Sequence, residues 1–275
     1  MLPVVQHEIR PGRWPYVTTC LIGLNLLVFV FELSLGARLV PFLQEWGVVP
    51  GRIHAAAGGH DVLTVGTAMF LHMGVLQVFG TMWFLWVFGD AVEDAFGRWL
   101  FLAVYLGGGL VGTIVCIAVA QASPLPVVGA GGAVSAVMAA SLVLWPKARL
   151  RIPSILVFLY ILLLLYQGLV LAGVPSLVLG GPLIFVLSVI AMIGLTRRYG
   201  GFLAGLLNMT ELPAWFVLGL FVSMLLFTGF LSVAGPGLVG AIGYWAYLGG
   251  FATGAVLAWS LPKHPILLAD RSLLG

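Results

Sequence analysis

The stretch PVVGAGGAVSAVMAAS, Pro126 to Ser141, consists mostly of small residues and carries no charge. It predicts a buried helix over 128–146, which ends at Pro146, where a missing N–H costs least. Glycine and alanine leave a stripe almost without side chains, against which another helix backbone can pack closely. The stripe residues are Gly129, Gly132, Ala133 and Ala136. The stretch therefore belongs inside a helix bundle.

The composition indicates an integral membrane protein. Of the 275 residues, 61% are hydrophobic and 8% are charged, whereas soluble domains carry roughly 25% charged residues; the mean hydropathy is +1.15. The net charge is only +3, and no basic stripe interleaved with aromatic residues suggests a nucleic-acid partner. Cys20 and Cys116 lie in apolar runs without a pairing pattern, so neither a disulfide framework nor a metal site is indicated.

Eight apolar stretches are long enough to cross a bilayer, which takes about 20 residues. They are 17–35, 65–88, 99–121, 128–146, 153–173, 177–196, 213–232 and 237–260. Pro182 lies inside one of them, so 153–196 is either two full crossings or a re-entrant hairpin. We predict an all-α, polytopic transmembrane helix bundle of about eight spans.

The basic residues predict the orientation, because lysine and arginine prefer cytoplasmic loops. With a cytoplasmic N-terminus, ten of the twelve basic residues face the cytoplasm, and only Arg38 and Arg52 lie outside. An even number of spans then places both termini in the cytoplasm. No small-residue cleavage site follows Arg10 and Arg13, so we expect the first apolar run to be retained as a span.

The predicted outer segment 36–64 is too polar to span the membrane, yet it contains Leu39, Phe42 and Trp46. Such a segment is expected to lie in the membrane interface as a loop with its apolar face down. The other loops and both tails are short, so residues 1–275 are predicted to form a single membrane domain. In the last span, Gly250 and Gly254 form a second small-residue pair for helix packing.

Several stretches, in order, resemble the rhomboid family of intramembrane serine proteases. They are RWPYVTTCLIGLNLLVFVFEL at 13–33, WGVVPGR at 46–52, the run 67–112, GAGGA at 129–133, WPKAR at 145–149, LPAWFVLGLF at 212–221 and WAYLGGFATG at 245–254. The resemblance implies a six-span core. It does not extend over 152–210, which we interpret as an inserted apolar hairpin.

The resemblance also implies where a catalytic site would lie, and all four matched positions depart from the family's pattern. Gly131 stands where the family has its serine nucleophile, and Tyr247 stands where it has the histidine base. Gln77 and Thr81 occupy the positions that help to bind the oxyanion. Glycine offers no nucleophilic atom, and tyrosine, with a pKa near 10, is a poor base at neutral pH. Loss of either group costs about 10⁶ in turnover in a well-studied serine protease.

An alternative is that the chemistry has moved to Ser135 and His72. Ser135 lies one helical turn beyond Gly131 on the same face, and His72 is the one histidine in or beside a predicted span. The simpler interpretation is that Ser135 bonds to its own helix and His72 packs near the top of the second span. The other histidines are scattered through tails and loops, so no metal or cofactor is predicted.

We predict that the ring of Tyr247 fills the former catalytic cleft beside Gly131, and that its hydroxyl bonds to Gln77 or Thr81. The predicted function is that of a non-catalytic rhomboid-like protein of a bacterial inner membrane. It would bind transmembrane segments of other membrane proteins as an adaptor, chaperone or accessory subunit, with 152–210 as a possible partner surface. A transporter or channel is disfavoured, because no ionisable residue is placed near the middle of the membrane.

Overall fold

The computed structural model describes residues 5–6, 14–56, 58–146, 148–153, 209–234 and 243–262. The chain divides into two compact units, one of Met1–His7 with Ala148–Pro213 and one of Glu8–Lys147 with Ala214–Gly275. The second unit contains the long helices and every candidate site residue.

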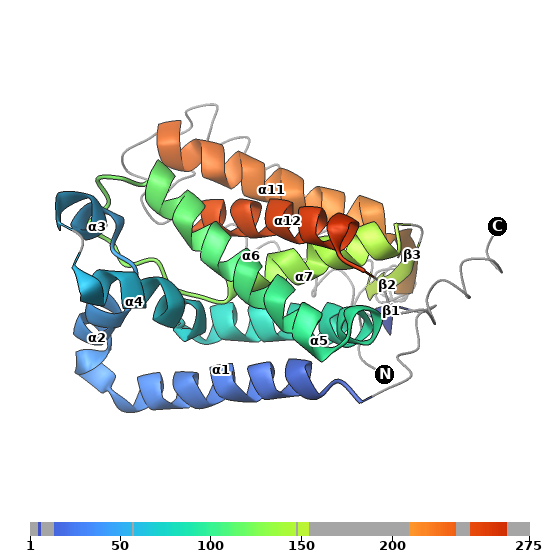
Figure 1. Ribbon diagram of the computed structural model, residues 1–275, viewed down its shortest axis with the longest axis horizontal. Helices are drawn as coiled ribbons and strands as arrows, with labels where there is room; N and C mark the ends of the chain where they lie inside the picture. Colours follow the sequence, from blue (N-terminus) through green and yellow to red (C-terminus); the bar gives the residue numbers. More distant parts are fainter. Residues whose placement is uncertain are drawn as a thin grey trace, which may run out of the picture. The chain divides into compact units, whose positions relative to one another are not determined.

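Six long helices form the larger unit: α1 (Tyr16–Ser34), α5 (Val75–Phe96), α6 (Arg98–Val119), α7 (Gly131–Leu144), α11 (Ala214–Ala234) and α12 (Tyr244–Ser260). Figure 1 shows α12 lying beside α7, α6 and α11, with α5 between α7 and α1. By length and composition α1 and α6 each suffice to cross a membrane, and α7 is a shorter apolar helix. The helical bundle is therefore present, while the count of eight spans and the cytoplasmic termini remain predictions.

The small residues of α7 and α12 bring the two backbones into close contact. A Cβ atom on Gly250 would overlap the backbone carbonyl of Gly132, and one on Gly254 would overlap the backbone of Ala136. Since backbone atoms cannot rotate away, only glycine at 250 and 254 permits this approach. On the neighbouring helix α6, a Cβ atom on Gly112 would likewise overlap the carbonyl oxygen of Ala246.

The second predicted span is wrong at its start. The structure breaks 65–88 into the end of α4 (Gly59–Thr67), a 3-10 turn at Ala68–Phe70, an extended break at 71–74, and then α5. Side chains satisfy two amides of the break: the carboxylate of Glu32 accepts from the N–H of His72 at 3.0 Å, and Oε1 of Gln77 accepts from Met73 at 2.8 Å. These bonds replace the helical ones that hydropathy alone would predict.

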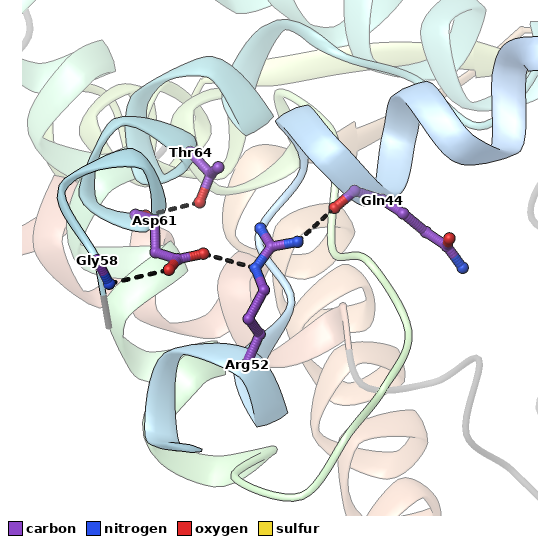
Figure 2. Close-up of polar contacts among 5 residues, drawn as sticks. All are labelled: Gln44, Arg52, Gly58, Asp61 and Thr64. Carbon is purple, nitrogen blue, oxygen red and sulfur yellow. Dashed lines mark hydrogen bonds and ion pairs between the residues drawn. The ribbon is translucent and has the colours of Figure 1, made fainter. Parts of the chain in front are cut away.

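The outer segment folds into short helices: a 3-10 turn at Gly36–Arg38, α2 (Leu39–Trp46), α3 (Pro50–Ala56) and α4. An arginine and an aspartate connect them, as Figure 2 shows. Arg52 of α3 pairs through Nε with Asp61 of α4 and donates through Nη1 to the carbonyl of Gln44 in α2, at 2.8 Å. Asp61 also accepts from the N–H of Gly58 at 3.0 Å, which caps the start of α4.

The smaller unit contains a three-stranded antiparallel sheet in the order β1 (Val5–Gln6), β2 (Arg149–Pro153) and β3 (Met209–Pro213). In its register Leu150 pairs with Leu212, and Arg149 lies 3.9 Å from Glu211. The all-α prediction is wrong for these residues. The sequence RLRI at 149–152 alternates charged and apolar residues, a pattern that is typical of a strand. Most of 152–210, including both predicted spans there, lies outside the described residues.

Candidate functional site

The four matched positions lie in the larger unit, at the helix ends on one side of the bundle. Gly131 is the first residue of α7, Tyr247 lies in the first turn of α12, and Gln77 and Thr81 lie in the first two turns of α5. The Oγ of Ser135 fixes α7 against α12, because it lies 2.9 Å from the carbonyl oxygen of Gly132 and 2.8 Å from that of Tyr247.

The ring of Tyr247 lies directly against Gly131. A Cβ atom at residue 131 would overlap Cζ and Cε2 of that ring, so no side chain at 131 fits while the tyrosine stays in place. On its other side the ring packs against Phe221 of α11, with ring centres 6.4 Å apart. Phe221 in turn lies 6.0 Å from Phe84 of α5, measured between ring centres. Tyr247 thus occupies the space of a side chain at 131 and contacts α11.

Gln77 joins two backbone segments. Its Nε2 donates to the carbonyl oxygen of Val128 at 2.9 Å, while its Oε1 accepts from the N–H of Met73. The chain reaches Val128 through Gly129, whose φ of +127° is a conformation that glycine adopts readily. Both ends of the amide group are therefore engaged within the protein, where they hold the loop before α7 onto the start of α5.

Thr81 and His72 form a buried polar pair beside Gln77. The Oγ1 of Thr81 donates to the carbonyl oxygen of Gln77 at 2.8 Å and lies 3.4 Å from Nε2 of His72. The imidazole of His72 is fully buried, and its Nδ1 has no hydrogen-bond partner among the described residues. The ring of Phe29 packs edge-on against it. Among the described residues, no serine hydroxyl forms a hydrogen bond with this imidazole.

The predicted hydrogen bond from the hydroxyl of Tyr247 to Gln77 or Thr81 is wrong. Within the part of the chain that the structure describes, the hydroxyl of Tyr247 forms a hydrogen bond with neither Gln77 nor Thr81. The reason is that both side chains bond to nearby backbone, and Thr81 lies against His72. Tyr247 lines a hollow of about 270 Å³ together with Met73, Leu125, Val127, Gln77 and Tyr244.

The structure does not bring Ser135 and His72 together. Ser135 is buried between α7 and α12, where its hydroxyl bonds to backbone oxygens. His72 lies near Thr81 of α5, and its backbone N–H donates to the carboxylate of Glu32 in α1. No described hydrogen bond links the serine to the histidine, so the geometry offers no base for this hydroxyl.

The Arg52–Asp61 pair of Figure 2 was missed by the sequence analysis, although opposite charges nine residues apart were a visible signal. The N–H of Gly58, and after it the Arg52 guanidinium, hold the pKa of the Asp61 carboxyl below its usual range. The pair links α3 to α4, and α3 contacts the loop before α7 through the bond from Gly51 N–H to the carbonyl of Ser123.

No cluster of three or more metal-binding side chains occurs among the described residues. The site consists of the four matched positions, the ring contacts Tyr247–Phe221, Phe221–Phe84 and Phe29–His72, and Ser135, whose hydroxyl bonds to backbone oxygens. The ring of Tyr247 fills the space beside Gly131, and the amide of Gln77 is bonded to the backbone. We call the ring of Tyr247 in this space the plug; a small hollow lies beside it.

Comparison with known proteins gives a family match: the model of the rhomboid domain matches residues 59–210, more than half of the chain. The matched range includes the segment 152–210, so its interpretation as an insert remains a prediction. No solved structure gives a significant match.

Two curated relatives are similar over part of their length. The chain is 33% identical to presenilin-associated rhomboid-like protein A, mitochondrial, of Danio rerio over 40% of this chain and 30% of that protein. It is 31% identical to the rhomboid protease GluP of Bacillus subtilis (strain 168) over 44% of this chain and 23% of that protein. The chain therefore aligns with less than a third of either relative.

Proposed function

Since the chain belongs to the rhomboid family, we propose that it is a member without peptidase activity that binds transmembrane segments of other proteins. It is an integral membrane protein, as the family is. Its proposed role is that of an adaptor, a chaperone or an accessory subunit of a membrane complex. The bacterial inner membrane is part of the proposal; one relative carries "mitochondrial" in its name and another comes from a bacterium.

The relationship between Gly131 and Tyr247 carries this proposal. The nucleophile position has no side chain, and the space it would need is filled by the ring of Tyr247. An oxyanion site has little to stabilise without a nucleophile, and the amide of Gln77 already bonds to Met73 and Val128. What the bundle retains is a helical scaffold with a hollow at one end, which supports binding rather than hydrolysis.

The helix packing beside the plug supports a binding surface there. Phe221 of α11 lies between Phe84 of α5 and Tyr247 of α12. Met73 lines the hollow and is 56% exposed, so an arriving apolar helix would find an accessible contact next to the plug. The segment 152–210 is a further proposed partner surface.

A photo-crosslinking residue at Met73 tests the binding proposal in membranes. The matched control is Leu27 on α1, which is 72% exposed and lies away from the hollow. We expect a discrete adduct with a membrane-protein segment from position 73 and only lipid or diffuse adducts from position 27. The same adducts from both positions, or none from position 73, would contradict helix binding at this site.

The second candidate function is proteolysis through Ser135 and His72, which the name of the GluP relative favours. A fluorophosphonate probe on the purified protein distinguishes the two. We expect no labelling, because the hydroxyl of Ser135 bonds to backbone oxygens and has no base beside it. Labelling that disappears in Ser135→Ala would replace the non-catalytic proposal with the protease.

A further inference from the structure

A buried carboxylate lies beside the break that precedes α5. Glu32 is the third residue from the end of α1 and is fully buried. Both oxygens of its carboxylate accept from the backbone N–H of His72, at 3.0 and 3.2 Å. Among the described residues, this amide is the only hydrogen-bond donor to the carboxylate. A carboxylate is costly to bury in a membrane protein, so its place beside the break calls for a specific role.

The bond between Glu32 and His72 leads to the hollow beside the plug. The residue after His72, Met73, donates its N–H to Oε1 of Gln77 at 2.8 Å. In turn, Nε2 of Gln77 donates to the carbonyl oxygen of Val128 at 2.9 Å. Met73, Gln77 and Val128 all line the hollow, whereas no residue of α1 does. Glu32 therefore reaches the hollow only through the backbone of the break.

The break depends on an acceptor from outside its own segment. Residues 71–74 are not helical, so their N–H groups need acceptors other than a carbonyl one turn earlier. His72 is fully buried, and water cannot replace a hydrogen bond that its amide loses there. Without the carboxylate of Glu32 the break must shift until this amide finds another acceptor, and Met73 moves with it.

We propose that Glu32 is a positioning residue for the hollow beside the plug. Its carboxylate holds the His72 amide and thereby keeps Met73 and Gln77 where an arriving transmembrane segment meets them. The inference rests on the proposed binding function, because it assigns a further residue to that site. Glu32 acts from α1 through the break and does not itself line the hollow.

Three substitutions at residue 32 separate hydrogen bonding from charge. Glu32→Leu removes the acceptor, Glu32→Asp keeps the charge but withdraws the oxygens by one methylene group, and Glu32→Gln keeps an oxygen at the same reach without the charge. Hydrogen exchange of the peptide 70–78 is followed on the purified full-length protein in mild detergent. We expect exchange at least about tenfold faster in the Leu and Asp variants, as for one lost hydrogen bond to a charged group. The Gln variant is expected to stay within about threefold of the unmodified protein, because a neutral acceptor remains.

A second arm measures binding in membranes, with the photo-crosslinking residue at position 73. The yield of the discrete adduct is expected to fall by roughly tenfold in Glu32→Leu and Glu32→Asp, because the position of residue 73 then varies. In Glu32→Gln the yield is expected to recover. Rescue by the conservative variant distinguishes loss of the acceptor from loss of the charge.

The matched control is Thr18→Val at the other end of the same helix. Thr18 is the third residue of α1 and is fully buried, and its Oγ1 donates to the carboxylate of Glu93 at 2.9 Å. The substitution removes a buried hydrogen bond from α1 without touching the hollow. We expect it to lower the unfolding temperature while exchange at 70–78 and the adduct from position 73 stay unchanged.

The two arms separate failure of the positioning role from failure of the binding function. Unchanged exchange in Glu32→Leu and Glu32→Asp, an unchanged adduct in both, or equal losses in Thr18→Val would overturn the positioning role. If Glu32→Leu does not fold, Glu32→Asp decides. No adduct from position 73 of the unmodified protein would contradict the proposed binding function instead, and the exchange rates alone would then decide whether Glu32 positions the hollow.

Discussion

The ring of Tyr247 in α12 occupies the space that a side chain on Gly131 of α7 would need. The two residues come from helices whose backbones touch at Gly132 and Gly250. A side chain added at position 131 therefore requires the ring of Tyr247 to move. The filled space therefore depends on both Gly131 and Tyr247.

The first prediction concerns this pair. Gly131→Ala is expected to destabilise the protein by roughly 1–3 kcal/mol, since an added methyl group overpacks a filled space. In a chain that already carries Tyr247→Ala, the same change is expected to cost little. Unfolding of all four forms in detergent gives the coupling energy directly. Additive effects of the two substitutions would show that the ring does not depend on Gly131.

The second prediction concerns lost catalysis. A chain with Gly131→Ser, Tyr247→His, Gln77→His and Thr81→Asn carries the residues that the rhomboid resemblance requires. It is expected to react with a fluorophosphonate, whereas the same chain without Gly131→Ser is not, because loss of a nucleophile costs about 10⁶ in turnover. The rate of covalent labelling measures this. Equal labelling of the unmodified protein would mean that it already contains a reactive serine.

The third prediction concerns the glycine contact between α7 and α12. Gly250→Ala is expected to destabilise by several kcal/mol or to prevent folding, because the new methyl group meets the backbone of Gly132. The matched control is Gly80→Ala on α5, where nothing lies within 4 Å of the added atom. That control is expected to stabilise by about 0.5–1 kcal/mol through its helix propensity. Similar unfolding temperatures for both variants would contradict close contact at 250.

The fourth prediction concerns the outer helices and pH. The pKa of Asp61 is lowered in the folded protein by the Gly58 N–H and by Arg52. The unfolded chain, with a pKa near 3.9, therefore binds a proton first as the pH falls. The stabilisation is complete above about pH 4 and is lost as the pH falls through the lower folded value.

Hydrogen exchange in α2 to α4 measures this effect. At pH 6 the amides of Asp61→Asn are expected to exchange faster than those of the unmodified protein, because the pairing with Arg52 is gone. The difference is expected to shrink as the pH falls through the folded pKa of Asp61. A difference that stays constant down to that pH would show that the carboxylate charge contributes nothing to these helices.

Particular residues show what could be predicted from the sequence. The positions of α1, α6 and α7 agree with the apolar stretches to within three residues at each end, and the rhomboid resemblance is confirmed by the family match. The break at 71–74 could not be predicted, because it depends on Glu32 reaching His72 from another helix. The strand at Arg149–Pro153 was visible as an alternating pattern, but its pairing partner lies far along the chain.

The order of residues was enough to predict a helical membrane protein of the rhomboid family, which the family match confirms. The replacement of four catalytic positions is what the resemblance implies. Hydropathy, small-residue spacing and the missing serine are local properties, which the order of residues fully specifies. The tertiary structure was needed to show that the ring of Tyr247 lies in the space beside Gly131, and that Tyr247 lines a hollow. Those facts depend on how α7 and α12 pack, because the ring of Tyr247 comes to lie against Gly131 only when the two helix backbones approach each other.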